Sequence, residues 1–207
     1  MIIFKILIFH FLIFIKLILI SSNVLATEIY SNSIKVLVNE NIITEYEIKQ
    51  RIKINSIISQ IEITKDNYRQ FEEIVLQELI NEKLKEEKIK EYEVILTEKQ
   101  FNDYELGYFN NSWMDKDSLK NIFIKNNINY NLFQNYLEIE SAWQRLIVGL
   151  YLRVISATET EINELKNKND FMTDEQANEI ILQRQLDIKS TKLVNDLRNE
   201  ATIEFKK

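Results

Sequence analysis

Apolar residues recur every three or four positions between Asn67 and Glu91, which is the spacing of an amphipathic helix. The predicted apolar stripe consists of Phe71, Ile74, Val75, Leu76, Leu79, Ile80 and Leu84. The opposite, polar face consists of Glu72, Glu73, Gln77, Glu82, Lys83, Lys85, Glu86 and Glu87. Because neither glycine nor proline interrupts the segment, we expect a long helix against which the shorter elements pack.

Further helix starts are marked by four tetrads in which Thr is followed three positions later by Glu or Gln. In such a capping box, the threonine hydroxyl accepts from a backbone amide while the Glu or Gln side chain reaches back. The tetrads are Thr44–Glu47, Thr97–Gln100, Thr158–Glu161 and Thr173–Gln176. Asp115 and Asn129 predict two more helices, over 116–126 and 130–148. The pattern predicts a mainly α, multi-helix architecture.

Short β-elements are expected at both ends of this helical region. Ile34–Val38 is rich in β-forming residues, 39–41 is a turn candidate and Ile42 begins a short return strand. The alternating segment 202–205 is a candidate final strand. The helix before it, expected over 174–199, has a predicted apolar face of Ala177, Ile180, Ile181, Ile188 and Leu197.

Residues 1–26 have the features of a secretory signal peptide: Lys5, an apolar run and a small-residue cleavage site ending at Ala26. Lys16 interrupts the apolar run, which argues against a stable transmembrane helix. We therefore expect cleavage after Ala26 and a periplasmic location. An uncleaved N-terminal anchor is the alternative.

Cleavage would leave 24 basic and 32 acidic residues, a net charge of −8, and would remove His10, the only histidine. With no cysteine in the chain, His- or Cys-dependent nucleophiles and zinc sites are excluded from that product. Its carboxylates follow helical surface patterns, and no nucleotide- or calcium-binding motif is present. The negative charge disfavours nucleic-acid binding. We expect no cofactor, no metal and no enzymatic activity.

The order of elements resembles the SurA family of periplasmic chaperones. The resemblance begins at Val36–Ile48, continues through the "LxxLIxxxL" pattern of Leu76–Leu84 and Val94–Glu98, and ends at Thr173–Phe205. It implies a SurA-like chaperone module whose terminal strand pairs with the N-terminal strand. The implied organisation is a module over 27–157, a short helix or linker over 158–172, and a C-terminal helix and strand over 173–207.

Two departures from the family matter. Only about twenty residues separate Ile155 from Ala177, too few for the parvulin-type isomerase domain usually present there. An active prolyl isomerase is therefore nearly excluded. The family also has a glycine where this chain has Glu93, which argues against a left-handed, glycine-type helix end at that point.

The resemblance implies an ATP-independent holdase that binds unfolded outer-membrane β-barrel proteins and works beside the outer-membrane assembly machinery. Such binding needs exposed aromatic and apolar surface. The candidate residues are Tyr104, Tyr108, Phe109, Trp113 and Met114, the last three in an expected Asn-rich loop. Core packing is the stronger expectation for Phe101 and Tyr104 and an equal alternative for the loop residues. A scaffold subunit that binds one folded partner is the alternative function.

Overall fold

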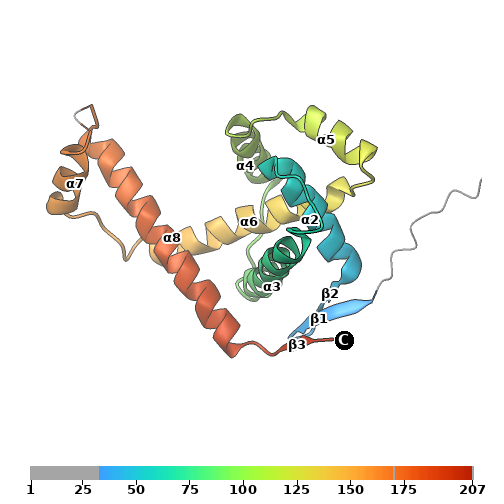
Figure 1. Ribbon diagram of the computed structural model, residues 1–207. Helices are drawn as coiled ribbons and strands as arrows, with labels where there is room; N and C mark the ends of the chain where they lie inside the picture. The colour runs from blue at the N-terminus through green and yellow to red at the C-terminus, as the bar shows by residue number, and fades with distance from the viewer. Residues whose placement is uncertain (1–32, 170, 207) are drawn as a thin grey trace, which may run out of the picture. The chain divides into compact units, whose positions relative to one another are not determined.

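The computed structural model describes residues 33–169 and 171–206, and its fold is mainly α, as the sequence predicts (Figure 1). The expected signal peptide lies outside these residues. The strands are β1 (Ile34–Val38), β2 (Asn41–Thr44) and β3 (Ile203–Phe205). The helices are α2 (Glu45–Ser59), α3 (Tyr68–Glu91), α4 (Glu98–Asn110), α5 (Lys116–Lys125), α6 (Tyr130–Tyr151), α7 (Glu159–Lys166) and α8 (Asp174–Glu200).

The predicted caps begin the helices as expected. At α2, the Glu47 amide donates to Thr44 Oγ1 over 3.2 Å, and the Thr44 amide donates to Glu47 Oε2 over 2.8 Å. The other three capping boxes also form, at the starts of α4, α7 and α8. Asp115 and Asn129 accept hydrogen bonds from the first turns of α5 and α6. These side chains satisfy backbone donors that the helices themselves leave free.

The three strands form one antiparallel sheet in the order β2-β1-β3, which confirms the expected pairing of the chain's two terminal strands. Val36 lies opposite Phe205, and Val38 lies opposite Ile203. Just beyond β1, the Asn39 amide donates to the Thr202 carbonyl over 2.9 Å. The last strand is therefore held by backbone hydrogen bonds to the beginning of the described chain.

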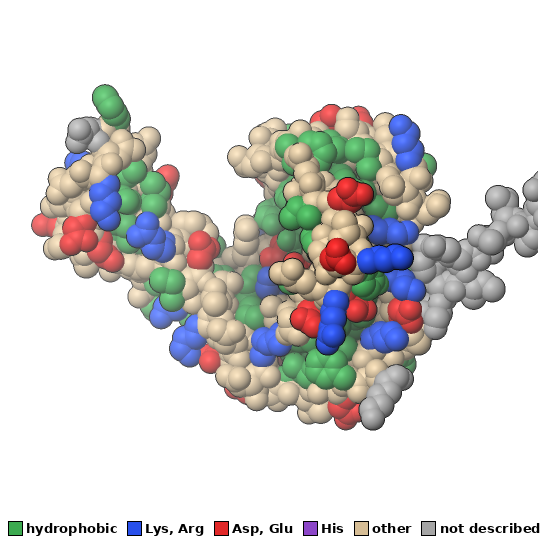
Figure 2. Space-filling view, viewed as in Figure 1, with side chains coloured by type: hydrophobic (Ala, Val, Ile, Leu, Met, Phe, Trp, Pro, Cys, Tyr) green, Lys and Arg blue, Asp and Glu red, His purple; other side chains and the backbone are tan. Residues whose placement is uncertain are grey.

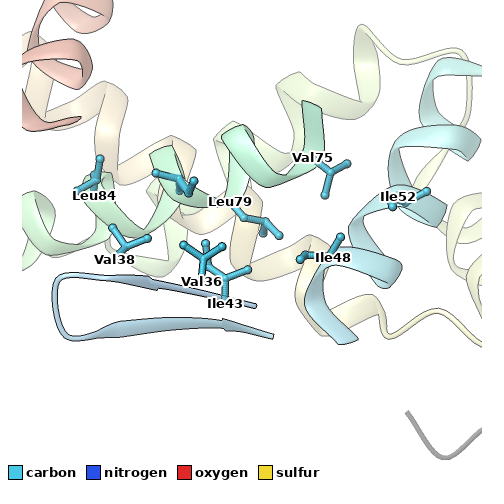
Figure 3. Packing of buried hydrophobic residues seen from close by; sticks show 9 residues of the cluster. Val36, Val38, Ile43, Ile48, Ile52, Val75, Leu79 and Leu84 are labelled. Carbon is cyan, nitrogen blue, oxygen red and sulfur yellow. The ribbon is translucent and has the colours of Figure 1, made fainter. Parts of the chain in front are cut away.

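The sheet and α3 enclose the first hydrophobic core (Figure 3). Val36 and Val38 point from β1 toward α3, where Leu79 and Leu84 lie nearest to them, and Ile48 of α2 closes the end. All five side chains are at most 3% exposed. Alternation along β1 places every second side chain on the same face of the sheet, so one short strand supplies two core residues.

Helix α8 crosses α6 and also packs against α3 (Figure 1). Its buried residues are Ala177, Ile181, Leu186 and Val194. The predicted face is wrong at Ile180 and Ile188, which are 40% and 61% exposed. A single apolar face fits a helix that packs along one partner. The 27 residues of α8 pack successively on α7, α6 and α3, so the side that is covered changes along the helix.

Two predictions about α3 are also wrong. Glu82, assigned to the polar face, is 6% exposed and pairs with buried Arg51 of α2 over 2.5 Å. Ile74, assigned to the apolar stripe, is 47% exposed. Both residues line one cleft beside α3, where Ile74 stays open to solvent while α2 covers Glu82, which pairs with Arg51.

Helix α3 ends in a left-handed residue although that position is not glycine. Glu93 has φ 51°, its amide donates to the Lys90 carbonyl, and the Val94 amide donates to the Ile89 carbonyl over 3.1 Å. This is the hydrogen-bond pattern of a Schellman motif. The expectation that Glu93 prevents a left-handed end is therefore wrong. These hydrogen bonds outweigh the steric strain, together with the packing of Ile89 and Val94 against another hydrophobic core, which consists of Trp143, Leu146, Ile147, Leu186 and Val194.

Candidate peptide-binding groove

Two adjoining cavities open along the helices and share Ile58 of α2 and Tyr108 of α4 as lining residues. The outer cavity, of about 520 Å³, is lined by α2, α4 and the segment after α4. The inner cavity, of about 550 Å³, is lined by residues of α2, α3, α4 and α6. We call the two together the groove. On the face drawn in Figure 2, hydrophobic side chains gather around α2, α4 and α5.

The outer cavity contains three of the five predicted binding residues. It is lined by Ile58, Tyr104, Gly107, Tyr108, Asn111, Ser112 and Trp113. Tyr104 and Tyr108 are one helical turn apart on α4, so both rings lie on the same side of the helix. Gly107 lies between them in sequence, and a β-carbon built on it would meet nothing within 4 Å. The space in front of α4 is thus open at this position.

Trp113 has both a structural and a surface role. Its indole Nε1 donates to the Ile58 carbonyl over 2.9 Å, which satisfies an acceptor in the last turn of α2. The side chain is nevertheless 54% exposed. One edge of the ring therefore anchors the segment after α4 to α2, while the rest of the ring forms part of the groove wall.

A second hydrophobic core consists of Ile54, Leu119, Phe123, Ile128, Phe133 and Leu137. Phe109 and Met114 pack against this core and are absent from the groove lining. Phe109 was expected in a loop, but it lies in the last turn of α4, with its ring centroid 6.4 Å from that of Phe133. The loop assignment is wrong because α4 continues through Gly107 to Asn110. Phe101 and Tyr104, both expected in the core, do pack against it, and Tyr104 also lines the outer cavity.

Sequence reasoning missed the inner cavity. Its apolar lining residues include Ile54, Ile58, Ile61, Phe71 and Ile74. Its polar and aromatic lining residues include Arg51, Glu82, Lys85, Tyr136 and Glu140. Arg51 pairs with Glu82, and its Cζ lies 4.8 Å from the centre of the Tyr136 ring. Lys85 pairs with Glu140 over 2.6 Å. The only available signal was the spacing of Phe71, Ile74 and Glu78 on α3, which also fits a surface stripe.

The groove tyrosines stay uncharged at neutral pH. Burial, with smaller contributions from Glu140 and Tyr108, raises the pKa of Tyr104 to about 12. Burial also raises the pKa of Tyr108, and burial followed by the nearby Glu140 charge raises that of Tyr136. Burial raises the pKa of Glu82 as well, because the Arg51 guanidinium offsets only part of the desolvation. The rings therefore offer neutral amphipathic contact area.

This arrangement is suited to reversible contact with a chain segment. It combines aromatic walls with a few fixed polar groups, as ligand-binding clefts do. Within the part of the chain that the structure describes, no three His, Cys, Asp or Glu side chains are grouped to hold a metal ion. None of the helices in residues 33–169 and 171–206 has an apolar stretch long enough to cross a membrane.

No protein-family model and no curated protein matches this sequence.

Proposed function

We propose that this protein is a SurA-type holdase that binds unfolded segments of outer-membrane β-barrel precursors in the periplasm without ATP or enzymatic activity. The observation that carries the proposal is the groove, in which Tyr104, Tyr108 and Trp113 line an open space beside Ile58. Aromatic side chains give large contact area at a low entropic cost, which suits weak contact with many sequences.

The size of the groove fits this role. Its two cavities, of about 520 and 550 Å³, each fall within the roughly 300–1,000 Å³ typical of small-ligand clefts, and they adjoin. Adjoining cavities of this size suit several consecutive side chains of an extended segment. The fold, with its terminal strand paired to β1, supports the SurA resemblance on which the client class and the periplasmic location depend.

Gly107 provides a direct test, because it lines the outer cavity and a β-carbon added there meets nothing within 4 Å. Gln is a good helix former and neutral, so Gly107→Gln should stabilise α4 by up to about 1 kcal/mol. We expect it to weaken, at least severalfold, the ability of the chain to keep a urea-unfolded outer-membrane barrel protein soluble on dilution, as measured by light scattering.

The matched control is Gly149→Gln. Gly149 is also helical, its added β-carbon also meets nothing within 4 Å, and it lies in α6 outside the groove lining. The control should protect the barrel protein as well as the original chain does. Full protection by Gly107→Gln would exclude the groove as the binding site. If the original chain does not reduce aggregation of the barrel protein, the holdase proposal is contradicted and the scaffold alternative is favoured.

A further inference from the structure

The inner cavity has more negative than positive side chains. Its lining includes two cations, Arg51 and Lys85, and three carboxylates, Glu78, Glu82 and Glu140. Arg51 is paired with Glu82, and Lys85 with Glu140. The third carboxylate, Glu78, therefore remains without a cationic partner in this cavity.

Glu78 is half-buried and fixed in place. Its Oε2 accepts a hydrogen bond from Asn55 Nδ2 of α2 over 2.7 Å. None of the ion pairs found among residues 33–169 and 171–206 includes Glu78; the other carboxylates of the cavity pair with Arg51 and Lys85. A carboxylate partly removed from water attracts a cation more strongly than a fully hydrated one does.

The surroundings of Glu78 are apolar on one side. Phe71 and Ile74 precede it by seven and four residues on α3, so all three lie on one face of the helix. Ile54, Ile58 and Ile61 contribute the facing wall. A side chain that reaches Glu78 thus passes between apolar surfaces, which suits the long methylene stem of lysine or arginine.

We propose that the inner cavity selects extended apolar segments that carry a lysine or arginine, whose cation pairs with Glu78. The inference rests on the proposed function and adds a charge preference to it. Segments with an acidic residue at the same place are rejected, because they would bring two carboxylates together in a partly desolvated cleft.

The test uses three short peptides of identical leucine and serine composition that differ only in a central lysine, glutamine or glutamate. Binding to the full chain is measured by isothermal titration calorimetry and by the intrinsic fluorescence of its two tryptophans, Trp113 and Trp143. We expect the lysine peptide to bind roughly tenfold more tightly than the glutamate peptide at low salt, and less selectively at high salt.

Glu78→Gln should remove most of this preference, so that the lysine and glutamate peptides bind with similar affinity. The matched control, Glu73→Gln, alters a 69% exposed carboxylate of the same helix that pairs with Arg69 outside the cavity. It should preserve the preference. An unchanged melting temperature of both variants shows that the comparison concerns binding rather than folding.

The outcomes separate the two proposals. If no peptide binds, the proposed function and this inference both fail. If all three peptides bind equally, the groove binds segments but the charge preference is wrong. If Glu78→Gln keeps the preference for lysine, the cation is recognised elsewhere and the assignment to Glu78 is overturned.

Discussion

Three helices end in a left-handed residue that is not glycine. Gln60, Glu93 and Asn127, at the ends of α2, α3 and α5, have φ values of 57°, 51° and 53°. At each end, the amide of the following residue donates to the carbonyl five residues earlier, as in a Schellman motif. The chain has only two glycines, both inside helices. Local strain at these ends is therefore balanced by hydrogen bonds and packing.

Glu93→Gly should therefore stabilise the protein. Glycine adopts positive φ without the steric cost that a β-carbon brings, although it also increases the entropy of the unfolded chain. We expect a net gain of about 0.5–1 kcal/mol in the free energy of unfolding, measured by urea denaturation. Lys90→Gly, inside α3, is the control and should cost about 1 kcal/mol. A lower urea midpoint for Glu93→Gly would contradict the strain argument.

At the scale of elements, the start of α2 is stabilised by ionic contacts beyond its capping box. Glu45 pairs with Lys49 over 2.7 Å and Lys35 over 3.4 Å, and it accepts from Ser33 Oγ over 2.8 Å. The hydrogen bond from Lys49, then that from Ser33, lowers the pKa of Glu45 from 4.5 to about 2. These contacts connect the first turn of α2 to Lys35 of β1 and to Ser33, the residue that precedes β1.

This lowered pKa predicts a pH-dependent effect of Glu45→Gln. Because the pKa is lower in the folded state, the charged form contributes stability above about pH 4.5, and the contribution is lost as the pH falls toward 2. The variant should unfold at a lower temperature than the original chain at pH 7, and the difference should shrink below pH 4.5. Thermal unfolding followed by circular dichroism from pH 7 to pH 2 measures it.

The control is Glu98→Gln, which changes the corresponding first-turn acid of α4, where none of these contacts is made. It isolates the interaction of a carboxylate with the helix dipole. A pH profile of Glu45→Gln no steeper than that of Glu98→Gln would show that the contacts with Lys49 and Ser33 contribute nothing.

At the scale of the whole described chain, α8 is fixed at several points far apart in sequence. Trp143 Nε1 of α6 donates to Ser190 Oγ over 2.8 Å. Arg198 donates to Asn81 Oδ1 over 2.7 Å and to Gln77 Oε1 over 2.5 Å, both on α3. Beyond the helix, β3 pairs with β1. The pairing of β3 with β1 closes a loop of more than 160 residues, as the hydrogen bond from the Thr202 amide to Asn39 Oδ1 shows.

Deletion of residues 202–207 should destabilise the protein cooperatively. It removes the backbone hydrogen bonds to β1 and the contact of Ile203 with the first core, a loss on the order of 3 kcal/mol. Urea unfolding should show one transition at a lower midpoint. The control, Lys206→Ala, removes an exposed ion pair with Glu204 and should change stability by less than about 0.5 kcal/mol. An unchanged midpoint for the deletion would mean that β3 is dispensable.

The sequence by itself determined the features that depend on neighbours along the chain. A capping box involves residues three positions apart, so Thr44, Thr97, Thr158 and Thr173 predicted four helix starts correctly. The apolar spacing of α3 likewise predicted most of its buried face. The mainly α class and the hairpin followed from the same local patterns. The pairing of β3 with β1 came from the family resemblance.

Only the tertiary structure decided which side chains are covered by distant elements. Ile74 and Glu82 lie on one helix and line the same cleft, and their burial is reversed from expectation because α2 covers Glu82 while Ile74 stays exposed to solvent. The same holds for the groove, where Trp113 is fixed by the Ile58 carbonyl, 55 residues earlier. Local spacing contains no information about such partners, because burial depends on contacts made only after the chain has folded.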